Sequence, residues 1–591
     1  MRTSGGAYAV VTALVAGAAL VACAPQPPAL VAPRHSAASS AAASPATREV
    51  VFGVDQLFGG VNSGFNPHTL ADLTPVSEAL AGLLLPSAFH QTPTGQWVLD
   101  QTLLTSAEVT STEPFTVTYR IRSNAQWSDV TPIAAEDFGY LAQQMRTQPG
   151  VVDSAGYQLI DQVVSRNGGK TAEVIFHRPY AGWRTLFHHL LPAHLLKDAP
   201  GGWSTALDAD LPVSGGPFAM TSVDRSRGEI VLERNDRYWD TPARVDRIRL
   251  RQSSEAALIE ALRTGGAQGA LFSRPNAITE SLLRAANLGE SPTVVPQPVL
   301  VSVLLRPASH VLSDQRVRTA VAALLDRPSL IATGVASGPA AALRADSEVL
   351  APSATGYHPT APATGVPVAP DQDTARRLLT DAGYTRGPAG WQRAGQPLRL
   401  VVAAAANREP YGTLAARVAD QLRNAGVDAE LREVDPDELY GTMLGPSADA
   451  VPSHGGSAEV ATPALATLGG AQPGVDIVVL PQPTAGHPAT QVASWSGCPL
   501  VVPARLAPAP PNPANFCDLA LQPMIEQALT QEDPAGPVPP TVEALLWERA
   551  VTIPLYQPAS LLITTNQLLD VVPGTPREGP FDDASRWQVR R

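Results

Sequence analysis

The 591-residue sequence has no excess of positive charge. Lys and Arg number 42 against 54 Asp and Glu, which gives a formal net charge of −12. Because a protein that binds nucleic acid needs a basic surface against the phosphates, this balance argues against a nucleic-acid partner. Cysteine is also scarce, with three in the chain. The 44% of hydrophobic residues still allows a large core, and the length suggests two or three domains.

Sequence motifs of several enzyme classes are also missing. The chain contains no Gly-x-Ser-x-Gly elbow and no His-Glu-x-x-His, and Gly169-Lys170 lacks the earlier glycine of a phosphate-binding loop. Paired glycosidase carboxylates cannot be recognised from sequence. His188, His189 and His194 raise a metal hypothesis, but adjacent histidines on a helix do not face one point and no cysteine or carboxylate is close in sequence. We therefore predict no enzyme, no cofactor and no metal site.

The N-terminus has the pattern of a targeting segment. Arg2 is its only early charge, and the apolar run from about residue 7 to 22 is short for a membrane span. The run ends in Leu20-Val-Ala-Cys23, which resembles a bacterial lipobox, so we predict a lipoprotein signal peptide over residues 1–23 with diacylglycerol on Cys23. The alternative is a plain signal peptide. Residues 24–47, rich in Pro, Ala and Ser, are expected to tether the folded part to the outer face of the cell membrane.

The other two cysteines are Cys498 and Cys517. Disulfides persist in exported proteins, and the intervening segment is rich in proline, so it has little means of holding itself by packing. We predict a disulfide that stabilises the fold by about 3 kcal/mol. The alternative is a pair of free, buried thiols.

The clearest secondary-structure pattern lies in the first third of the chain. Residues 115–122 alternate apolar and polar side chains, which predicts a half-buried strand. Trp127 follows as an apolar anchor, and a helix is expected to open near Ala135 with carboxylates in its first turn. Farther on, Val299–Leu305 is continuously apolar, which suggests a buried strand in a parallel position.

Four ordered motifs carry a family resemblance. They are Tyr119-Arg-Ile-Arg with Ala125-Gln-Trp-Ser-Asp129 and Ala135-Glu-Asp-Phe138; Leu232-Glu-Arg-Asn-Asp-Arg-Tyr-Trp239; Asp314-Gln-Arg-Val-Arg318 with Asp326-Arg327; and Ile553-Pro-Leu-Tyr556. This series resembles the extracellular solute-binding proteins of the oligopeptide, dipeptide and nickel class, family 5. Val130 stands where that family usually has glycine. The resemblance spans the chain from about Val50 onward.

The resemblance implies an α/β fold of the periplasmic-binding-protein type (type II, oligopeptide-binding class), with three lobes, mixed sheets and a hinged cleft. Lobe I would comprise residues 48–76, 206–292 and 546–591. Lobe II would be residues 77–205. Lobe III would be residues 293–545, with a low-complexity insertion at 445–474. Ligand would lie in the cleft, for which we name Phe65, Asn66, Leu304, Pro481 and Gln482.

Within the family, several stretches are most similar to a branch associated with phosphatidylinositol mannosides. These are Phe65-Asn-Pro-His68, Leu85-Pro-Ser-Ala-Phe89, Phe115-Thr-Val-Thr-Tyr119 and Gln148-Pro-Gly-Val-Val-Asp153. The resemblance implies a monomeric protein that binds or senses an acylated tetramannoside and regulates its flow into lipomannan and lipoarabinomannan synthesis. An ABC permease or a mannosyltransferase is a possible partner.

The alternative is a peptide-binding subunit of an ABC importer. Peptide-binding members commonly hold the ligand's α-ammonium with an aspartate after a late strand, whereas Asp476-Ile-Val-Val-Leu-Pro-Gln-Pro483 has no acid after Leu480. Proteins that bind sugars usually stack them on exposed aromatic rings, but we expect most of the chain's tryptophans to lie in the core. Those considered are Trp97, Trp127, Trp183, Trp203 and Trp239.

Overall fold

The computed structural model describes residues 48–590, apart from 61–62, 93–94, 289–290, 446–473, 485, 500–511, 532–537 and 578. The predicted lipidation site Cys23, the signal peptide, the tether and nearly all of the predicted insertion lie outside the described residues. From Thr47 onward the chain forms one compact unit. Within it, three main sheets define three lobes, which are named here first, second and third.

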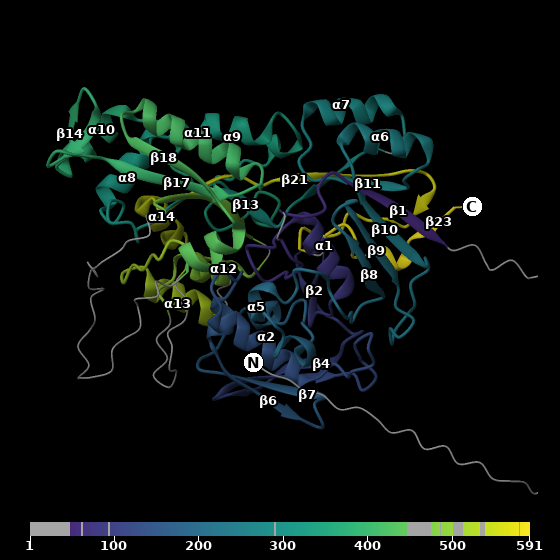
Figure 1. Cartoon of the computed structure of the whole chain (residues 1–591). Coiled ribbons are helices and arrows are strands. Elements are labelled where there is room, and N and C mark those ends of the chain that lie inside the picture. Colours follow the sequence, from purple (N-terminus) through teal and green to yellow (C-terminus); the bar gives the residue numbers. More distant parts are fainter. Residues whose placement is uncertain are drawn as a thin grey trace, which may run out of the picture. The chain divides into compact units, whose positions relative to one another are not determined.

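The first lobe is a seven-stranded mixed sheet in the order β12-β21-β11-β1-β10-β9-β8. The central strand β1 runs parallel to β10 and β11, and the flanking strands are antiparallel. Helices α6 and α7 lie together over the β11 side of this sheet (Figure 1). The elements are β1 (Glu49–Val54), α1 (Pro75–Leu84), β8 (Phe218–Asp224), β9 (Glu229–Arg234), β10 (Arg247–Gln252), α6 (Glu255–Thr264), β11 (Gly269–Phe272), α7 (Ala277–Ala286), β12 (Thr293–Pro296), β21 (Ala559–Thr564), β22 (Leu568–Leu569), the 3₁₀ turn Ala584–Arg586 and β23 (Gln588–Val589).

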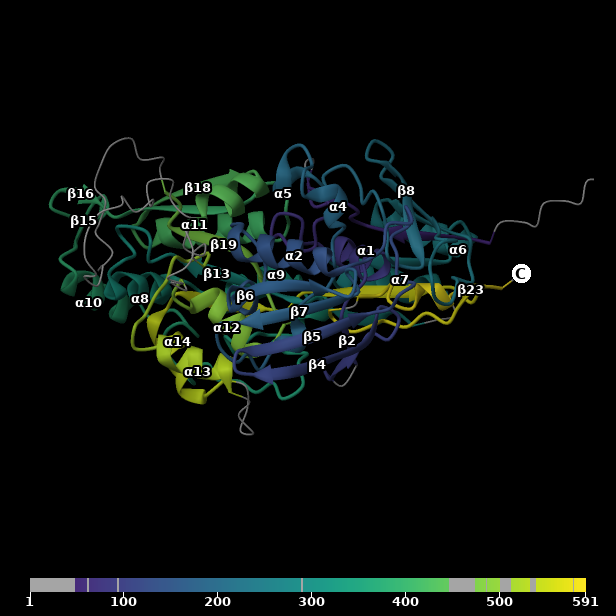
Figure 2. The same cartoon turned by 90° about the horizontal axis from the view of Figure 1, so that it is seen from below.

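The second lobe is a four-stranded antiparallel sheet in the order β4-β5-β7-β6, seen from below in Figure 2. Trp127 anchors it, because its indole is fully buried and donates to the Asp137 carboxylate at 3.3 Å. The same carboxylate accepts the Ala134 amide and so caps α2. The elements are β2 (Phe89–Gln91), β3 (Trp97–Leu99), β4 (Leu104–Thr112), β5 (Phe115–Ile121), α2 (Ala135–Thr147), α3 (Ala155–Gln158), β6 (Ile160–Arg166), β7 (Thr171–Phe176), the 3₁₀ turn Trp183–Thr185, α4 (Ala193–Leu196) and α5 (Gly202–Thr205).

The third lobe is a five-stranded sheet in the order β18-β17-β19-β13-β20. Helices α8, α9 and α10 begin at side-chain caps: Asp314, Asp326 and Asp371 each accept a backbone amide in the first turn. The elements are β13 (Val299–Leu305), α8 (Gln315–Leu324), α9 (Arg327–Val335), the 3₁₀ turn Pro339–Ala342, α10 (Gln372–Asp381), β14 (Thr385–Gly387), β15 (Gly390–Arg393), β16 (Gln396–Pro397), β17 (Arg399–Ala405), α11 (Tyr411–Asn424), β18 (Asp428–Val434), the π-helical turn Glu438–Met443, β19 (Ile477–Pro483), α12 (Pro488–Ser496), α13 (Gln522–Thr530), α14 (Pro540–Arg549) and β20 (Thr552–Tyr556).

Two expectations about strands need correction. β13 is buried on both faces as expected, but both of its neighbours, β19 and β20, run antiparallel to it. β12 joins the first lobe's sheet although it follows the predicted boundary at residue 292, and β20 joins the third lobe's sheet although it follows the boundary at 545. The chain therefore passes between the two sheets twice, because β12 continues into β13 and β20 continues into β21. The two short crossing segments are residues 297–298 and 557–558.

Candidate functional site

The two crossing segments lie side by side and hydrogen-bond to each other. The Gln297 amide donates to the Pro558 carbonyl at 2.8 Å, and the Gln557 side chain donates to the Gln297 carbonyl at 2.8 Å. Gln557 is 1% exposed, and its amide also bonds Ser353. A pair of short connections that joins two sheets in this way is the arrangement on which a hinge can turn.

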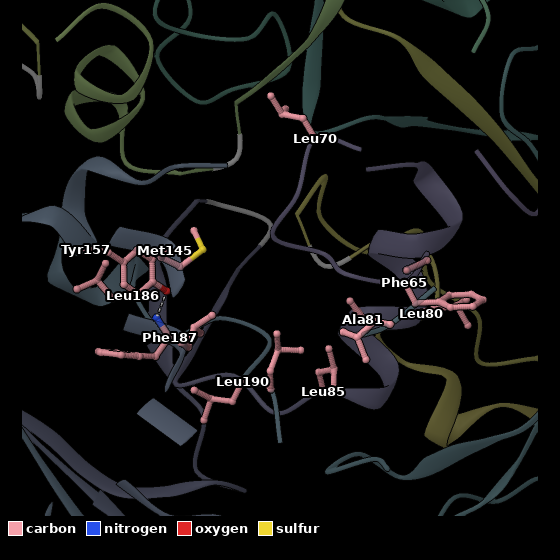
Figure 3. Close-up of a cluster of buried hydrophobic side chains, with 14 of the residues drawn as sticks. Phe65, Leu70, Leu80, Ala81, Leu85, Met145, Tyr157, Leu186, Phe187 and Leu190 are labelled. Carbon is pink, nitrogen blue, oxygen red and sulfur yellow. Dashed lines mark hydrogen bonds between the residues drawn. The ribbon is translucent and has the colours of Figure 1, made fainter. Parts of the chain in front are cut away.

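The loop between β1 and α1, residues 55–74, forms the first lobe's face toward the third. The Asp72 carboxylate organises this loop by accepting the amides of Gly64 at 2.6 Å and Asn66 at 3.1 Å. Burial raises the pKa of Asp72, although both hydrogen bonds oppose that shift. The loop also contributes Phe65 and Leu70 to the cluster of buried apolar side chains in Figure 3.

Arg408, which follows β17 in the third lobe, reaches across to this loop. Its guanidinium donates to the backbone carbonyls of Gly59, Leu70, Ala71 and Leu73, with distances of 3.1 Å to Gly59 and 3.1 Å to Leu73. The residue is 4% exposed. Four carbonyl contacts replace the water that a buried guanidinium loses, so this Arg408 contact holds the first and third lobes together without any ligand.

A polar pocket of about 50 Å³ lies between the three lobes. Its walls include His68 from the first lobe's loop, Asp153, His188 and His189 from the second lobe, and Arg577 from the C-terminal segment. Pro298 from the first crossing segment and Pro483 from the end of β19 close it on the third lobe's side. All three histidines are almost fully buried.

Hydrogen bonds assign the protons in the polar pocket. Arg577 donates through Nε to His188 Nε2 at 2.7 Å, so the proton of the neutral His188 ring sits on Nδ1. His68 Nε2 lies 3.0 Å from the His189 carbonyl, to which it can only donate. Burial lowers the pKa of His68 to about 4 and lowers those of His188 and His189 well below the ordinary value. The three rings are therefore neutral at pH 7.

Several polar atoms of this pocket have no hydrogen-bond partner among the described residues. They are Asp153 Oδ1, His188 Nδ1 and His189 Nε2. Asp153 lies 3.9 Å from the Arg577 guanidinium, and burial raises the pKa of its carboxyl. A buried polar atom without a partner is costly, so these atoms are poised to bond hydroxyl groups or water.

The second and third lobes are also in contact. Tyr180 Oη lies 2.6 Å from Thr490 Oγ1, and the Ala155 amide donates to Ser494 Oγ at 3.1 Å. A narrow pocket of about 30 Å³ between them is lined in part by Tyr440, whose hydroxyl has no hydrogen-bond partner among the described residues. The structure is thus in a closed state.

The five predicted cleft residues lie inside the packed core and line none of the pockets described here. Phe65 packs against Phe58, and Asn66 shapes its own loop by accepting the His68 amide. Leu304 and Pro481 are buried in neighbouring strands, and Gln482 accepts the Ser302 hydroxyl at 3.0 Å. Their part in ligand binding stays a prediction; their loop and the end of β19 do line the polar pocket through His68 and Pro483.

Sequence reasoning missed Arg408 and Arg577, which no motif marked. Asp153 ends one of the stretches that resemble the phosphatidylinositol mannoside branch, but it was not named as a site residue. His188 and His189 were considered only as metal ligands, and among the described residues no group of three or more His, Cys, Asp or Glu side chains is arranged to hold a metal ion. His194 lies apart from them, bonded to Asp129 at 2.8 Å.

The remaining predicted features are placed as follows. Cys498 and Cys517 form a disulfide, with Cα atoms 4.5 Å apart. Trp127, Trp183 and Trp203 are buried in the core, whereas Trp97 and Trp239 are partly buried against it. In the part of the chain that the structure describes, no helix combines the length and the apolar character needed to cross a bilayer.

Two relatives are similar to this chain over different shares of its length. It is 35% identical over 587 residues, covering 91% of both chains, to the Mycobacterium tuberculosis H37Rv protein named probable monoacyl phosphatidylinositol tetramannoside-binding protein LpqW. It is 30% identical over 333 residues, 54% of both chains, to the oligopeptide-binding protein OppA of Mycobacterium bovis.

Solved structures of distant sequence share the fold. The periplasmic EDTA-binding protein EppA superposes with a TM-score of 0.68 at 21% identity, over 92% of this chain and 97% of its own. The oligopeptide-binding protein AppA of Bacillus subtilis, solved with a nonapeptide, also gives 0.68, at 14% identity and over 92% and 100% of the two chains. The family model described as bacterial extracellular solute-binding proteins, family 5 middle, matches residues 100–465. This chain therefore belongs to family 5 of the bacterial extracellular solute-binding proteins.

Proposed function

We propose that this protein is a membrane-anchored, extracytoplasmic binding protein for a phosphatidylinositol mannoside. It would hold or sense an acylated tetramannoside and regulate its flow into lipomannan and lipoarabinomannan synthesis. The observation that carries the proposal is the 35% identity to LpqW over 91% of both chains, against 30% over 54% for OppA. Diacylglycerol on Cys23 would keep the protein in the membrane where such a lipid resides.

The polar pocket supports this proposal through the chemistry of its unpartnered atoms. A neutral imidazole N–H, an imidazole nitrogen and a carboxylate oxygen can each bond a sugar hydroxyl, which is both a donor and an acceptor. We propose that the protein binds its ligand and does not convert it, because the names of its relatives describe binding proteins.

The closed state sets a condition on binding. The polar and narrow pockets hold about 50 and 30 Å³, far too little for four hexoses. The lobes must therefore separate to admit a tetramannoside, and the Arg408 contact must break when they do.

The second candidate function is peptide binding for an ABC importer, favoured by the OppA relatives. Asp476, the acid nearest to the expected ammonium site, argues against it. Its carboxylate accepts the Ser309 hydroxyl and, at 2.6 Å, the Val401 amide, and it lines none of the pockets described here. A permease or a mannosyltransferase remains a proposed partner of the monomer.

Titration calorimetry tests the proposal with two probes, a deacylated phosphatidylinositol tetramannoside and a set of short peptides. We expect the mannoside to bind and the peptides not to. Asp153→Asn and His188→Ala should each weaken mannoside binding about tenfold, because the first replaces a charged acceptor by a weaker, neutral one and the second removes a hydrogen bond to a hydroxyl. Asp161→Asn, at an exposed carboxylate of the same lobe, is the matched control and should leave binding unchanged. Peptide binding without mannoside binding would overturn the proposal.

A further inference from the structure

A second pocket, which is apolar, lies at the crossing segments. It has a volume of about 90 Å³ and is separate from the polar pocket except for a shared wall at Leu73. Much of its lining is apolar: Val335 and Ala340 from α9 and the turn after it, Tyr411 at the start of α11, and Tyr556 and Ala559 at the second crossing. Both joined lobes contribute, so this apolar pocket belongs to the hinge region.

Gly334 in α9 helps to keep the apolar pocket empty of side chains. A Cβ atom at this position would lie 2.5 Å from the Tyr556 ring and 2.6 Å from its hydroxyl. Glycine inside a helix costs stability relative to alanine, so a packing reason for it is expected. Because Gly334 lets the ring lie against the helix, the Tyr556 ring forms a wall of the pocket and does not fill it. Among the described residues the Tyr556 hydroxyl has no hydrogen-bond partner.

The mouth of the apolar pocket carries one cation without a partner. Arg274 is exposed and makes no hydrogen bond or ion pair with any described residue. Of the neighbouring charges, Arg408 holds loop carbonyls, whereas the Glu409 carboxylate accepts the Thr413 amide at 3.2 Å and keeps its negative charge. A cation at the rim of an apolar pocket is the complement of a lipid with an anionic headgroup.

We propose that the apolar pocket takes a short segment of one acyl chain of a phospholipid whose phosphate pairs with Arg274. The inference rests on the proposed function and assigns the lipid part of that ligand, while the sugars bind elsewhere. The space is about three-fifths of a ~150 Å³ apolar cavity that admits benzene, so it suits a slim alkyl segment and excludes a hexose. Each methylene group that enters should raise affinity about fourfold.

The test uses the full-length protein and three probes below their micelle concentrations: a monoacyl phosphatidylinositol mannoside, its deacylated form and lysophosphatidylinositol. The wild type should bind the monoacyl probe at least tenfold more tightly than the deacylated one. Ala336→Trp, at the exposed mouth, and Ala340→Leu, at the floor, should abolish that difference. Ala394→Trp is the matched control for the first, because Ala394 is also exposed with a left-handed backbone (φ 50° against 45° at Ala336).

Arg274→Gln tests the phosphate contact, and should weaken both phosphate-containing mannosides about five- to tenfold and flatten their salt dependence. Equal binding of acylated and deacylated probes by the wild type would overturn the pocket assignment and leave the proposed function standing. The opposite result is that lysophosphatidylinositol binds, the two pocket variants abolish that binding, and the deacylated mannoside does not bind. It would support the pocket assignment and overturn the proposed function. An undiminished acyl preference in both pocket variants also overturns the assignment.

Discussion

Gly59 and Gly60 are neighbours in the loop after β1, but only Gly59 faces the Arg408 guanidinium. A Cβ atom at Gly59 would lie 2.6 Å from Arg408 Nη2 and 2.8 Å from the Thr74 methyl group, whereas one at Gly60 meets no described atom within 4 Å. Gly59→Ala should therefore displace the guanidinium and lower the free energy of unfolding by about 1–3 kcal/mol. Denaturant titration measures this loss.

Gly60→Ala is the matched control, and should leave stability unchanged or raise it by up to about 1 kcal/mol through the unfolded chain. Equal effects of the two substitutions would show that the Arg408 contact contributes no stability. The same comparison explains why this contact was not predicted: a glycine pair in a loop indicates a turn, and nothing in the sequence around Arg408 marks it as different from other arginines.

At the scale of elements, the side chain of Gln557 links the two crossing segments. Its amide bonds the Gln297 carbonyl and both the amide and the hydroxyl of Ser353, all within 2.9 Å. Gln557→Met keeps the shape of the side chain and removes these bonds, so the Gln297 carbonyl and the Ser353 amide lose their partner. We expect a loss of about 2 kcal/mol in the free energy of unfolding, measured by denaturant titration, against no change for Gln392→Met at an exposed position. An unchanged free energy of unfolding in Gln557→Met would mean that water replaces the hydrogen bonds of the amide.

Elements with a clear pattern were predictable, and their partners were not. The alternation of apolar and polar residues predicted β5 to within one residue, and the carboxylates of the first turn predicted where α2 begins. β13 shows the limit: a wholly apolar run reports burial on both faces, but its direction relative to β19 and β20 depends on where the chain crosses between sheets. Asp153 and Arg577, more than 400 residues apart in sequence, meet only in the folded state.

At the scale of the whole molecule, the Arg408 contact predicts closure without ligand. In solution X-ray scattering, the ligand-free wild type should have the radius of gyration of the closed structure, and Arg408→Ala should be more expanded because no other described residue bonds those four carbonyls. Arg399→Ala, at an exposed arginine of β17, the strand that Arg408 follows, is the control. An expanded wild type, or an unchanged Arg408→Ala, would contradict this role.

Carboxylates on both sides of the same boundary make closure depend on pH. Asp72 and Asp208 lie on one side and Asp437, just before the π-helical turn of the third lobe, on the other. Burial first, and then the neighbouring Asp72 charge, raises the pKa of Asp208 and that of Asp437 to about 6. Arg225 and Arg408 oppose these shifts, and Asp435 adds to that of Asp437.

Opening would return both pKa values toward the ordinary value near ~4, since it exposes the groups and separates Asp437 from Asp72. The closed state then binds protons more tightly than the open one between about pH 4 and 6. Its stabilisation is full below pH 4 and is lost as the pH rises through 6, when the carboxylates ionise and repel across the boundary. The radius of gyration of the Arg408→Lys variant, whose contact is weakened, should therefore increase between pH 4.5 and 7.5. Adding Asp437→Asn to this variant should remove most of that increase. Adding Asp373→Asn instead, at a carboxylate that is 90% exposed, should not. A radius of gyration that does not change with pH would show that the three carboxylates do not interact across the boundary.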